Sequence, residues 1–159
     1  MRGLNTREIN GILQNNAVTR RSFLGTYPAC MKPKTKRSFY TFITNSDEHH
    51  KAGEHWNAWV VNGDMIIFFD SFSRDPRDDH FPFHYRQLIE KFKTVKFVTR
   101  RVQSAKSTSC GLFCIHFIFA MTIGLDVPGF LSDYTKDLRK NDIIVLDIVS
   151  SFSDPRFFS

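Results

Sequence analysis

Cysteine is scarce in this chain, and apolar runs of membrane-spanning length are missing. Three cysteines make no full disulfide framework, which indicates a reducing compartment where a thiol stays free. The longest apolar run, residues 110–123, is shorter than the roughly 20 residues that cross a bilayer. No basic segment followed by a cleavable apolar run opens the chain. We therefore expect a protein that is neither secreted nor inserted in a membrane.

The sequence also has no internal repeat and no low-complexity segment. Its 159 residues are 42% hydrophobic and include 17 Phe, which is enough for a sizeable core. A domain of about 150 residues hides roughly two-thirds of its unfolded surface. We therefore predict one domain over residues 1–159.

The pattern of apolar residues predicts helices packed about a sheet. Asn5 and Glu8 have capping-box spacing at the start of a first helix. Strand-like runs, helical patterns and one loop follow: strands at 39–44, 56–61, 64–69 and 95–102, helices at 81–92, 110–123 and 132–152 (the last interrupted near Asn141), and a loop at 27–36. Both faces of the 56–69 hairpin are apolar, so both need a cover. The predicted class is α+β, a mainly antiparallel central sheet with a buried cysteine helix and flanking helices.

The hairpin is expected to bring a histidine and a carboxylate together. An Asn-Gly pair at 62–63 joins its two runs and favours a type I′ turn, because both residues tolerate positive φ. Counting outward from that turn places His55 opposite Asp70. Cross-strand Cβ atoms lie roughly 4.5–5.5 Å apart, within reach of a hydrogen bond between His55 Nδ1 and the Asp70 carboxylate.

The apolar run at 110–123 places a thiol at the start of a helix. The Thr-Ser pair at 108–109 suits the N-cap, and Gly124 suits the C′ position. Cys110 would then lie in the first turn, where the helix macrodipole favours a thiolate. A nearby imidazole can take the thiol proton and activate the sulfur. The Cys110 N–H and the Gln103 amide can stabilise the oxyanion of a tetrahedral intermediate.

Each of these residues also has a simpler explanation. A cysteine in an apolar run is usually a small buried hydrophobe, and this is our interpretation of Cys30 and Cys114. His55 beside a tryptophan can be an ordinary half-buried histidine, and Asp70 can cap the turn that follows it. Gln103 by itself indicates nothing. The conjunction of the four groups favours the catalytic interpretation.

The same residues resemble a known family. The motifs Gly-Glu-His-Trp at 53–56, Phe-Phe-Asp-Ser-Phe at 68–72 and Gln-x6-Cys-Gly-Leu-Phe-Cys at 103–114 are similar to those of the adenovirus maturation proteases, the adenain family. They also fit the wider clan that includes the ubiquitin-like (SUMO) deconjugating proteases. Two N-terminal segments, at 8–13 and 23–27, agree with this resemblance.

The resemblance implies a cysteine endopeptidase that cleaves viral precursor proteins during virion maturation, with glycine near the scissile bond. Cys110 would be the nucleophile, His55 the base, Asp70 the orienting acid and Gln103 an oxyanion donor. A deconjugase of a ubiquitin-like modifier with the same chemistry is one alternative, and a non-enzymatic basic DNA-binding protein is another. The expected location is the virion and the nucleus or cytoplasm of the host cell, and the expected state is a monomer.

Two features depart from the adenain pattern. That family has Glu at the position of Asp70, whereas Asp is the choice of the SUMO-protease branch; the reach is shorter by one methylene. The family is also activated by a short viral peptide, disulfide-linked to a cysteine between the carboxylate and glutamine positions. No cysteine occurs between Asp70 and Gln103, which argues against a covalent peptide activator here. The chemistry itself requires no cofactor.

The net charge of +6 and the pI of about 9.4 have two interpretations. One is a solvated basic surface, and the other is sequence-independent contact with the phosphates of a nucleic acid. The resemblance favours DNA, which the family uses as an activator. The candidate DNA-contacting residues are Arg20, Arg21, Lys34, Lys36, Arg37, Arg100, Arg101 and Lys106.

Histidine spacing gives little support for a metal site. Three histidines fall within 49–55, and Pro82 between His80 and His84 argues against a shared helical face. The Cys-x3-Cys-x-His pattern at 110–116 has no second ligand pair. We therefore predict no bound metal.

Overall fold

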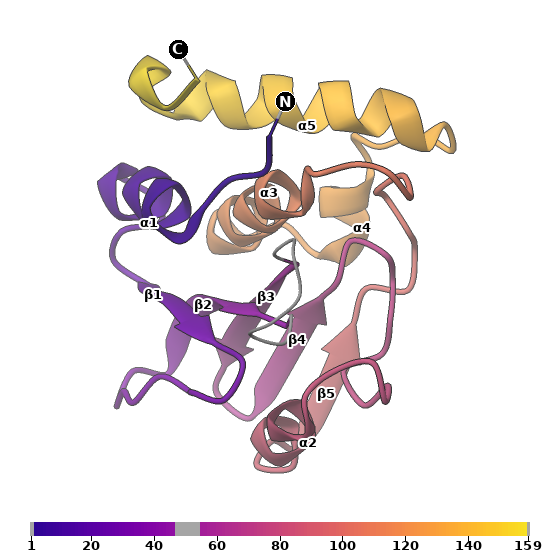
Figure 1. Cartoon of the computed structure of the whole chain (residues 1–159). Helices are drawn as coiled ribbons and strands as arrows, with labels where there is room; N and C mark the ends of the chain where they lie inside the picture. Colours follow the sequence, from indigo (N-terminus) through magenta and orange to yellow (C-terminus); the bar gives the residue numbers. More distant parts are fainter. Residues whose placement is uncertain (1, 47–54, 159) are drawn as a thin grey trace.

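The computed structural model describes residues 2–46 and 55–158. Along the chain these residues form α1 (Thr6–Asn15), β1 (Phe23–Pro28), β2 (Phe39–Asn45), β3 (Trp56–Asn62), β4 (Met65–Phe69), α2 (Phe83–Ile89), β5 (Thr94–Phe97), α3 (Cys110–Thr122), α4 (Val127–Leu131), α5 (Leu138–Phe152) and a 3-10 turn, Pro155–Phe158 (Figure 1). The histidines at 49–50 and the Gly-Glu pair of the motif at 53–56 lie outside the described residues. Within the described ranges, no helix combines the length and the apolar character needed to cross a bilayer.

The strands form one sheet in the order β1-β2-β3-β4-β5. Strands β2, β3 and β4 pair antiparallel, whereas β1 runs parallel to β2 and β5 runs parallel to β4. The α+β class is confirmed, and the sheet is antiparallel at its centre but mixed as a whole. Helix α2 lies in the crossover between β4 and β5, because a tight hairpin cannot join parallel neighbours.

Each face of the sheet carries its own apolar cluster. On one face, Trp56 and Val60 belong to a cluster with the buried residues of α1, α3 and α5. On the other face, Trp59 and Tyr85 belong to a second cluster, which α2 closes. Figure 1 shows α2 on the opposite side of the sheet from α3. The two apolar faces predicted for the hairpin are therefore present, and helices cover both of them.

The turn between β3 and β4 differs from the predicted one. Asn62 pairs with Met65, which leaves the Gly-Asp pair at 63–64 as the turn. Gly63 has a φ of +58°, and glycine at the first central position suits a type II′ turn. Asn62 remains a strand residue because it also pairs with Phe39 of β2. The predicted type I′ turn at 62–63 is therefore wrong, and pairing of Asn62 with both neighbouring strands accounts for the turn one residue later.

This change shifts the hairpin register by two residues. Ala58 pairs with Phe69, so the next position outward sets Asn57, and not His55, opposite Asp70. A shift of two keeps every side chain on its predicted face, since the side-chain period of a strand is two. His55 consequently stays on the same face as Asp70 and approaches it diagonally rather than directly.

Other element ends also differ from their sequence patterns. Strand β1 was not predicted, and the predicted loop at 27–36 begins only after Pro28. Helix α2 is shorter than predicted at both ends, and Pro82 is its N-cap. Strand β5 ends at Phe97, so the residues before Gln103 lie outside the sheet. Helix α5 begins after its Asp137 cap instead of at residue 132.

The predicted interruption of the last helix near Asn141 is wrong, because α5 continues through this residue. The Asn141 side chain is fully buried. Its Nδ2 donates to Val102 O at 3.1 Å and to Thr135 O at 2.9 Å, and its Oδ1 accepts from Thr135 N at 2.8 Å. Asn141 therefore ties the start of α5 to the segment that leads directly into Gln103.

We expect Asn141→Leu to lower the free energy of unfolding by about 2 kcal/mol, because the buried carbonyl of Val102 and the partly buried carbonyl and N–H of Thr135 lose their partner. Chemical denaturation monitored by circular dichroism measures this loss. Ser150→Ala removes an exposed hydroxyl from the same helix and should change stability by less than about 0.5 kcal/mol. Equal stabilities of the two variants would contradict a structural role for the Asn141 side chain.

Candidate active site

The four predicted catalytic residues come together in the structure. His55 immediately precedes β3, Gln103 follows β5, and Cys110 is the first residue of α3. These three side chains line one cavity, whose walls also include the N-terminal residues 3–5. Asp70 follows the end of β4 and is fully buried beside His55. Residues far apart in the sequence thus form one cluster.

The imidazole of His55 lies between Asp70 and Cys110. Its Nε2 is 2.5 Å from Asp70 Oδ1, whereas the predicted bond was to Nδ1. His55 is also hydrogen-bonded to the Cys110 side chain. With Nε2 on the carboxylate, Nδ1 is the ring nitrogen left for the thiol. The ring of Phe72 stacks on His55 with centroids 5.3 Å apart and covers it.

Asp70 accepts hydrogen bonds from several donors. Besides His55, Asn57 Nδ2 donates to Oδ1 at 3.0 Å, and Arg74 Nε donates to Oδ2 at 2.8 Å. The Arg74 backbone N–H also donates to Oδ2 at 3.1 Å, so Asp70 caps the following turn as well as binding the imidazole. The two explanations of Asp70 from sequence are therefore compatible. Sequence reasoning missed both Asn57 and Arg74, although Arg74 at i+4 was a visible charge partner.

The charges of this pair stabilise each other. Burial alone would disfavour the charged imidazolium, but hydrogen bonds and charge interactions with Asp70 and Cys110 raise the pKa of His55 to about 9. Burial likewise opposes ionisation of Asp70, yet His55 and Arg74 lower its pKa to about 2. Because the pKa of His55 lies above its unfolded value of 6.5, protonated His55 stabilises the fold below pH 6.5, and this contribution is lost as the pH rises through about 9.

Gln103 is held in a fixed orientation. The Ser71 hydroxyl donates to its Oε1, and its Nε2 donates to Ser107 O at 2.9 Å. Asp142 of α5 accepts from the hydroxyls of Ser104 and Ser107 and so anchors the loop before Cys110. A primary amide has two N–H donors, so one can serve Ser107 and the other an oxyanion. The sequence patterns assigned no role to the supporting residues, although Ser71 lies in the Phe-Phe-Asp-Ser-Phe motif and Asp142 follows Asn141.

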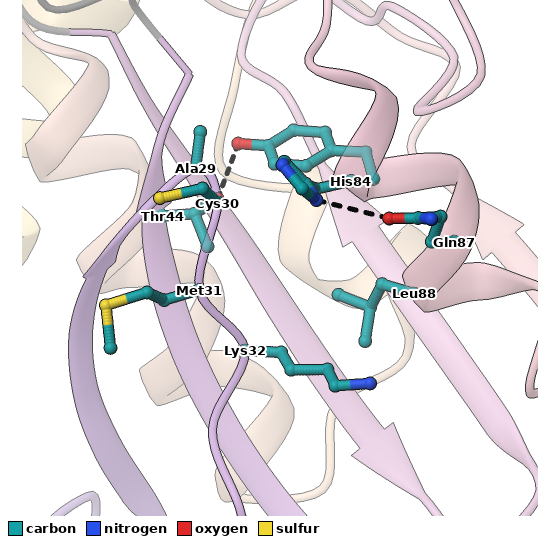
Figure 2. Close-up of a pocket in the computed structure, with 9 residues that line it drawn as sticks. Ala29, Cys30, Met31, Lys32, Thr44, His84, Gln87 and Leu88 are labelled. Atoms are coloured by element: carbon teal, nitrogen blue, oxygen red, sulfur yellow. Dashed lines mark hydrogen bonds between the residues drawn. The ribbon is translucent and has the colours of Figure 1, made fainter.

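The other two cysteines differ in environment. Cys114 is fully buried, its Sγ donates to Trp56 O at 3.3 Å, and burial raises its pKa well above the ordinary value. This agrees with its interpretation as a small buried residue. Cys30 is exposed, so the same interpretation is wrong for it. It lines a separate pocket between the loop after β1 and α2, which Figure 2 shows.

The basic residues predicted to contact DNA lie in two segments of the surface. Those at 20–21 and 34–37 are connected, because the Arg37 guanidinium donates to Arg21 O. Those at 100–106 border the active site, where Arg101 Nε donates to Gln103 O at 2.8 Å and the guanidinium lies 4.9 Å from the Phe72 ring centroid. Arg100 donates to Tyr134 O and is partly buried. Among the described residues, no three His, Cys, Asp or Glu side chains gather as a metal site would require.

The geometry defines a class of site. A thiol at a helix start, paired with an imidazole that a buried carboxylate orients and with an amide donor beside it, is the arrangement of a cysteine peptidase. The chain is similar in sequence to the adenovirus proteases. It is 30% identical to the protease of Bovine adenovirus 7 over 133 residues, which is 75% of this chain and 65% of that protein. It is 31% identical to the protease of Porcine adenovirus A serotype 3 over 129 residues, 73% of this chain and 58% of that protein.

Comparison of structures shows the same fold in a second viral protease. The crystal structure of an ASFV protease superposes with a TM-score of 0.59 at 19% identity, covering 91% of this chain and 66% of that protein. The chain therefore spans about two-thirds or less of the length of these relatives. No protein-family model matches the chain.

The coupling of His55 to Asp70 predicts a pH titration. In the wild-type protein, NMR should show His55 losing its proton near pH 9. In Asp70→Asn the carboxylate charge is lost while burial remains, so the His55 midpoint should fall by about two units or more. His116 provides an internal control, since burial lowers its pKa to about 4 and it should titrate identically in both proteins. A His55 midpoint that Asp70→Asn leaves unchanged would contradict this coupling.

Proposed function

We propose that this chain is a cysteine endopeptidase that cleaves viral precursor proteins in an infected cell. The observation that carries the proposal is the contact of His55 with both Asp70 and Cys110 at the start of α3. The similarity to adenovirus proteases supports the substrate class and the viral context. Cleavage during particle maturation, next to a glycine, is the specific form that we expect.

The mechanism follows from the positions of these groups. His55 Nδ1 holds the proton of Cys110 Sγ, and the thiolate attacks the carbonyl carbon of the scissile peptide bond. The resulting oxyanion accepts hydrogen bonds from the Gln103 amide and the Cys110 N–H. The His55 imidazolium then protonates the leaving amine, the C–N bond breaks, and a thioester remains. Water, deprotonated by His55, hydrolyses the thioester and restores the thiol.

Asp70 keeps His55 in the state that this cycle needs. Its bond to Nε2 fixes the ring so that Nδ1 faces the sulfur, and its charge stabilises the imidazolium. Phe72 covers the ring and limits the access of water from that side. Arg74 and Asn57 hold the carboxylate in place.

A peptide probe that carries a thiol-reactive group after glycine tests the proposal. We expect Cys110, although only 5% exposed, to react about 100-fold faster than the exposed Cys30. His55→Ala should remove this advantage, because the thiol loses its proton acceptor. Tandem mass spectrometry of tryptic peptides reports Cys30 on its own peptide. Fragmentation within the peptide 107–136 then distinguishes Cys110 from Cys114, because no Lys or Arg lies between them.

Hydrolysis then identifies the substrate. Peptides with an internal glycine site and a ubiquitin-like modifier with a Gly-Gly tail are offered in parallel, and Cys110→Ala is the inactive control. Cleavage of the internal sites supports the endopeptidase, whereas cleavage of the modifier tail alone would favour a deconjugase. Equal labelling of Cys110 and Cys30 with no cleavage would refute the proposal.

We also propose that DNA binds the exposed basic surface formed by residues 20–21 and 34–37. Its support is the contact between Arg21 and Arg37 in an otherwise basic, exposed region. Lysine and arginine bind phosphates by releasing counterions, so the affinity should fall steeply with salt. The second basic segment, beside the cavity, would let bound DNA influence the site.

Binding of a labelled DNA duplex at several salt concentrations tests this surface. Combining Arg21→Glu with Arg37→Glu should weaken binding and reduce the slope of log Kd against log salt by about two. Lys136→Glu, which changes an exposed lysine outside both segments, should reduce it by no more than about one. A double variant that binds like Lys136→Glu would exclude this surface.

A further inference from the structure

A row of buried polar residues crosses the sheet next to the active site. Thr44 of β2 pairs with Asn57 of β3, and the hairpin register sets Asn57 beside Asp70 at the end of β4. Directly paired residues project to the same face, so these three side chains lie in line. Tyr85 of α2 packs on this face and completes the row. All four residues are at most 1% exposed.

Hydrogen bonds connect the whole row. Trp59 Nε1 donates to Thr44 Oγ1 at 2.9 Å, and Thr44 Oγ1 lies 2.5 Å from the Tyr85 hydroxyl. Tyr85 donates to Asn57 Oδ1 at 3.0 Å, and Asn57 Nδ2 donates to Asp70 Oδ1 at 3.0 Å. The chain of bonds ends on the same Asp70 oxygen that binds His55 Nε2.

The direction of these bonds is determined by their two ends. An indole N–H can only donate, so Thr44 accepts from Trp59 and has its own proton for Tyr85. Tyr85 then donates to Asn57, whose amide oxygen faces Tyr85 and whose NH₂ faces the carboxylate. An ionised carboxylate can only accept, which completes the order. The Asn57 amide therefore has one orientation that satisfies every partner.

The end of this series of hydrogen bonds that is farther from Asp70 lies at the pocket shown in Figure 2. Thr44 and Tyr85 line this pocket together with His84 and Leu88 of α2, and the dashed line at Thr44 marks its bond to Tyr85. The active-site cavity has a different lining, which includes neither Asn57 nor Tyr85. The side chains of these two residues are connected to the active site by hydrogen bonds that end on Asp70.

We propose that Asn57 and Tyr85 are positioning residues that fix the rotation of the Asp70 carboxylate and so the hydrogen bond to His55. This inference rests on the proposed peptidase function. Arg74 binds Oδ2 through its Nε and its backbone N–H, at 2.8 and 3.1 Å, and reaches Oδ1 through Nη2 only at 3.3 Å. Asn57 and His55 make the two shorter bonds to Oδ1, at 3.0 and 2.5 Å. Without the amide, the carboxylate can rotate about the Arg74 contact and present Oδ1 less well to the imidazole. Tyr85 acts one bond further away, by keeping the Asn57 amide from turning over.

The test compares two tyrosines. Tyr85→Phe removes the hydroxyl from the row and leaves the ring packed against Trp59. Tyr134→Phe removes a comparable buried hydroxyl, which lies 2.5 Å from His116 Nδ1 and is not connected to Asp70 by any of these bonds. We expect Tyr85→Phe to lower kcat about fivefold with KM unchanged, and Tyr134→Phe to leave both unchanged. Asn57→Leu, which removes the bond to the charged group, should lower kcat about thirtyfold.

A second readout does not depend on turnover. The proton between His55 Nε2 and Asp70 Oδ1 should give a downfield resonance in the NMR spectrum of the wild-type protein and of Tyr134→Phe. It should shift upfield or broaden in Tyr85→Phe, a change that a purely structural loss would not produce. Thermal unfolding of each variant shows that the comparison is made on folded protein.

The outcomes separate the two proposals. If the wild-type protein cleaves peptides and Tyr85→Phe matches Tyr134→Phe in kcat and in the His55 resonance, the positioning role is refuted and the peptidase stands. If the wild-type protein has no activity but the resonance still responds to Tyr85→Phe and not to Tyr134→Phe, the coupling holds and the proposed function fails. A rise in KM with constant kcat would also refute the positioning role.

Discussion

The buried carboxylate of Asp70 is the group on which the rest of the site depends. It is fully enclosed, and a charge without partners in such a place would cost several kcal/mol. His55, Asn57 and the backbone and guanidinium of Arg74 supply the donors that make its burial tolerable. The same bonds determine which ring nitrogen of His55 faces the thiol. Stability and chemistry are therefore coupled at one residue.

Two structural features place Cys110 and Gln103 near that carboxylate. The apolar face of β3 packs against α3, which sets the first residue of the helix, Cys110, next to the histidine that precedes the strand. Helix α5 acts from further away, since Asn141 and Asp142 hold the segment between Val102 and the catalytic helix. Helix α5 thus supports a loop that lies more than 30 residues earlier in the sequence.

The comparison between sequence and structure is most informative at the hairpin. The Asn-Gly pair at 62–63 predicted a turn, yet pairing with β2 kept Asn62 in the strand and moved the turn by one residue. The His55–Asp70 contact survived because the register changed by an even number, which preserves the face of each side chain. The predicted bond through Nδ1 was wrong for a related reason. With Asn57 directly opposite Asp70, His55 reaches the carboxylate from a diagonal position and uses Nε2.

By itself the sequence determined the helix that carries Cys110, the capping box of α1 and the two apolar faces of the hairpin, because each depends on neighbours within a few residues. It also determined which four side chains could form the site, since their chemical types are few and their order is distinctive. Only the tertiary structure decided the hairpin register, the extra donors on Asp70 and the buried row that runs from Thr44 to the carboxylate. Those features arise where strands and helices distant in the chain meet. A hydrogen bond between such elements leaves no periodic pattern in the sequence.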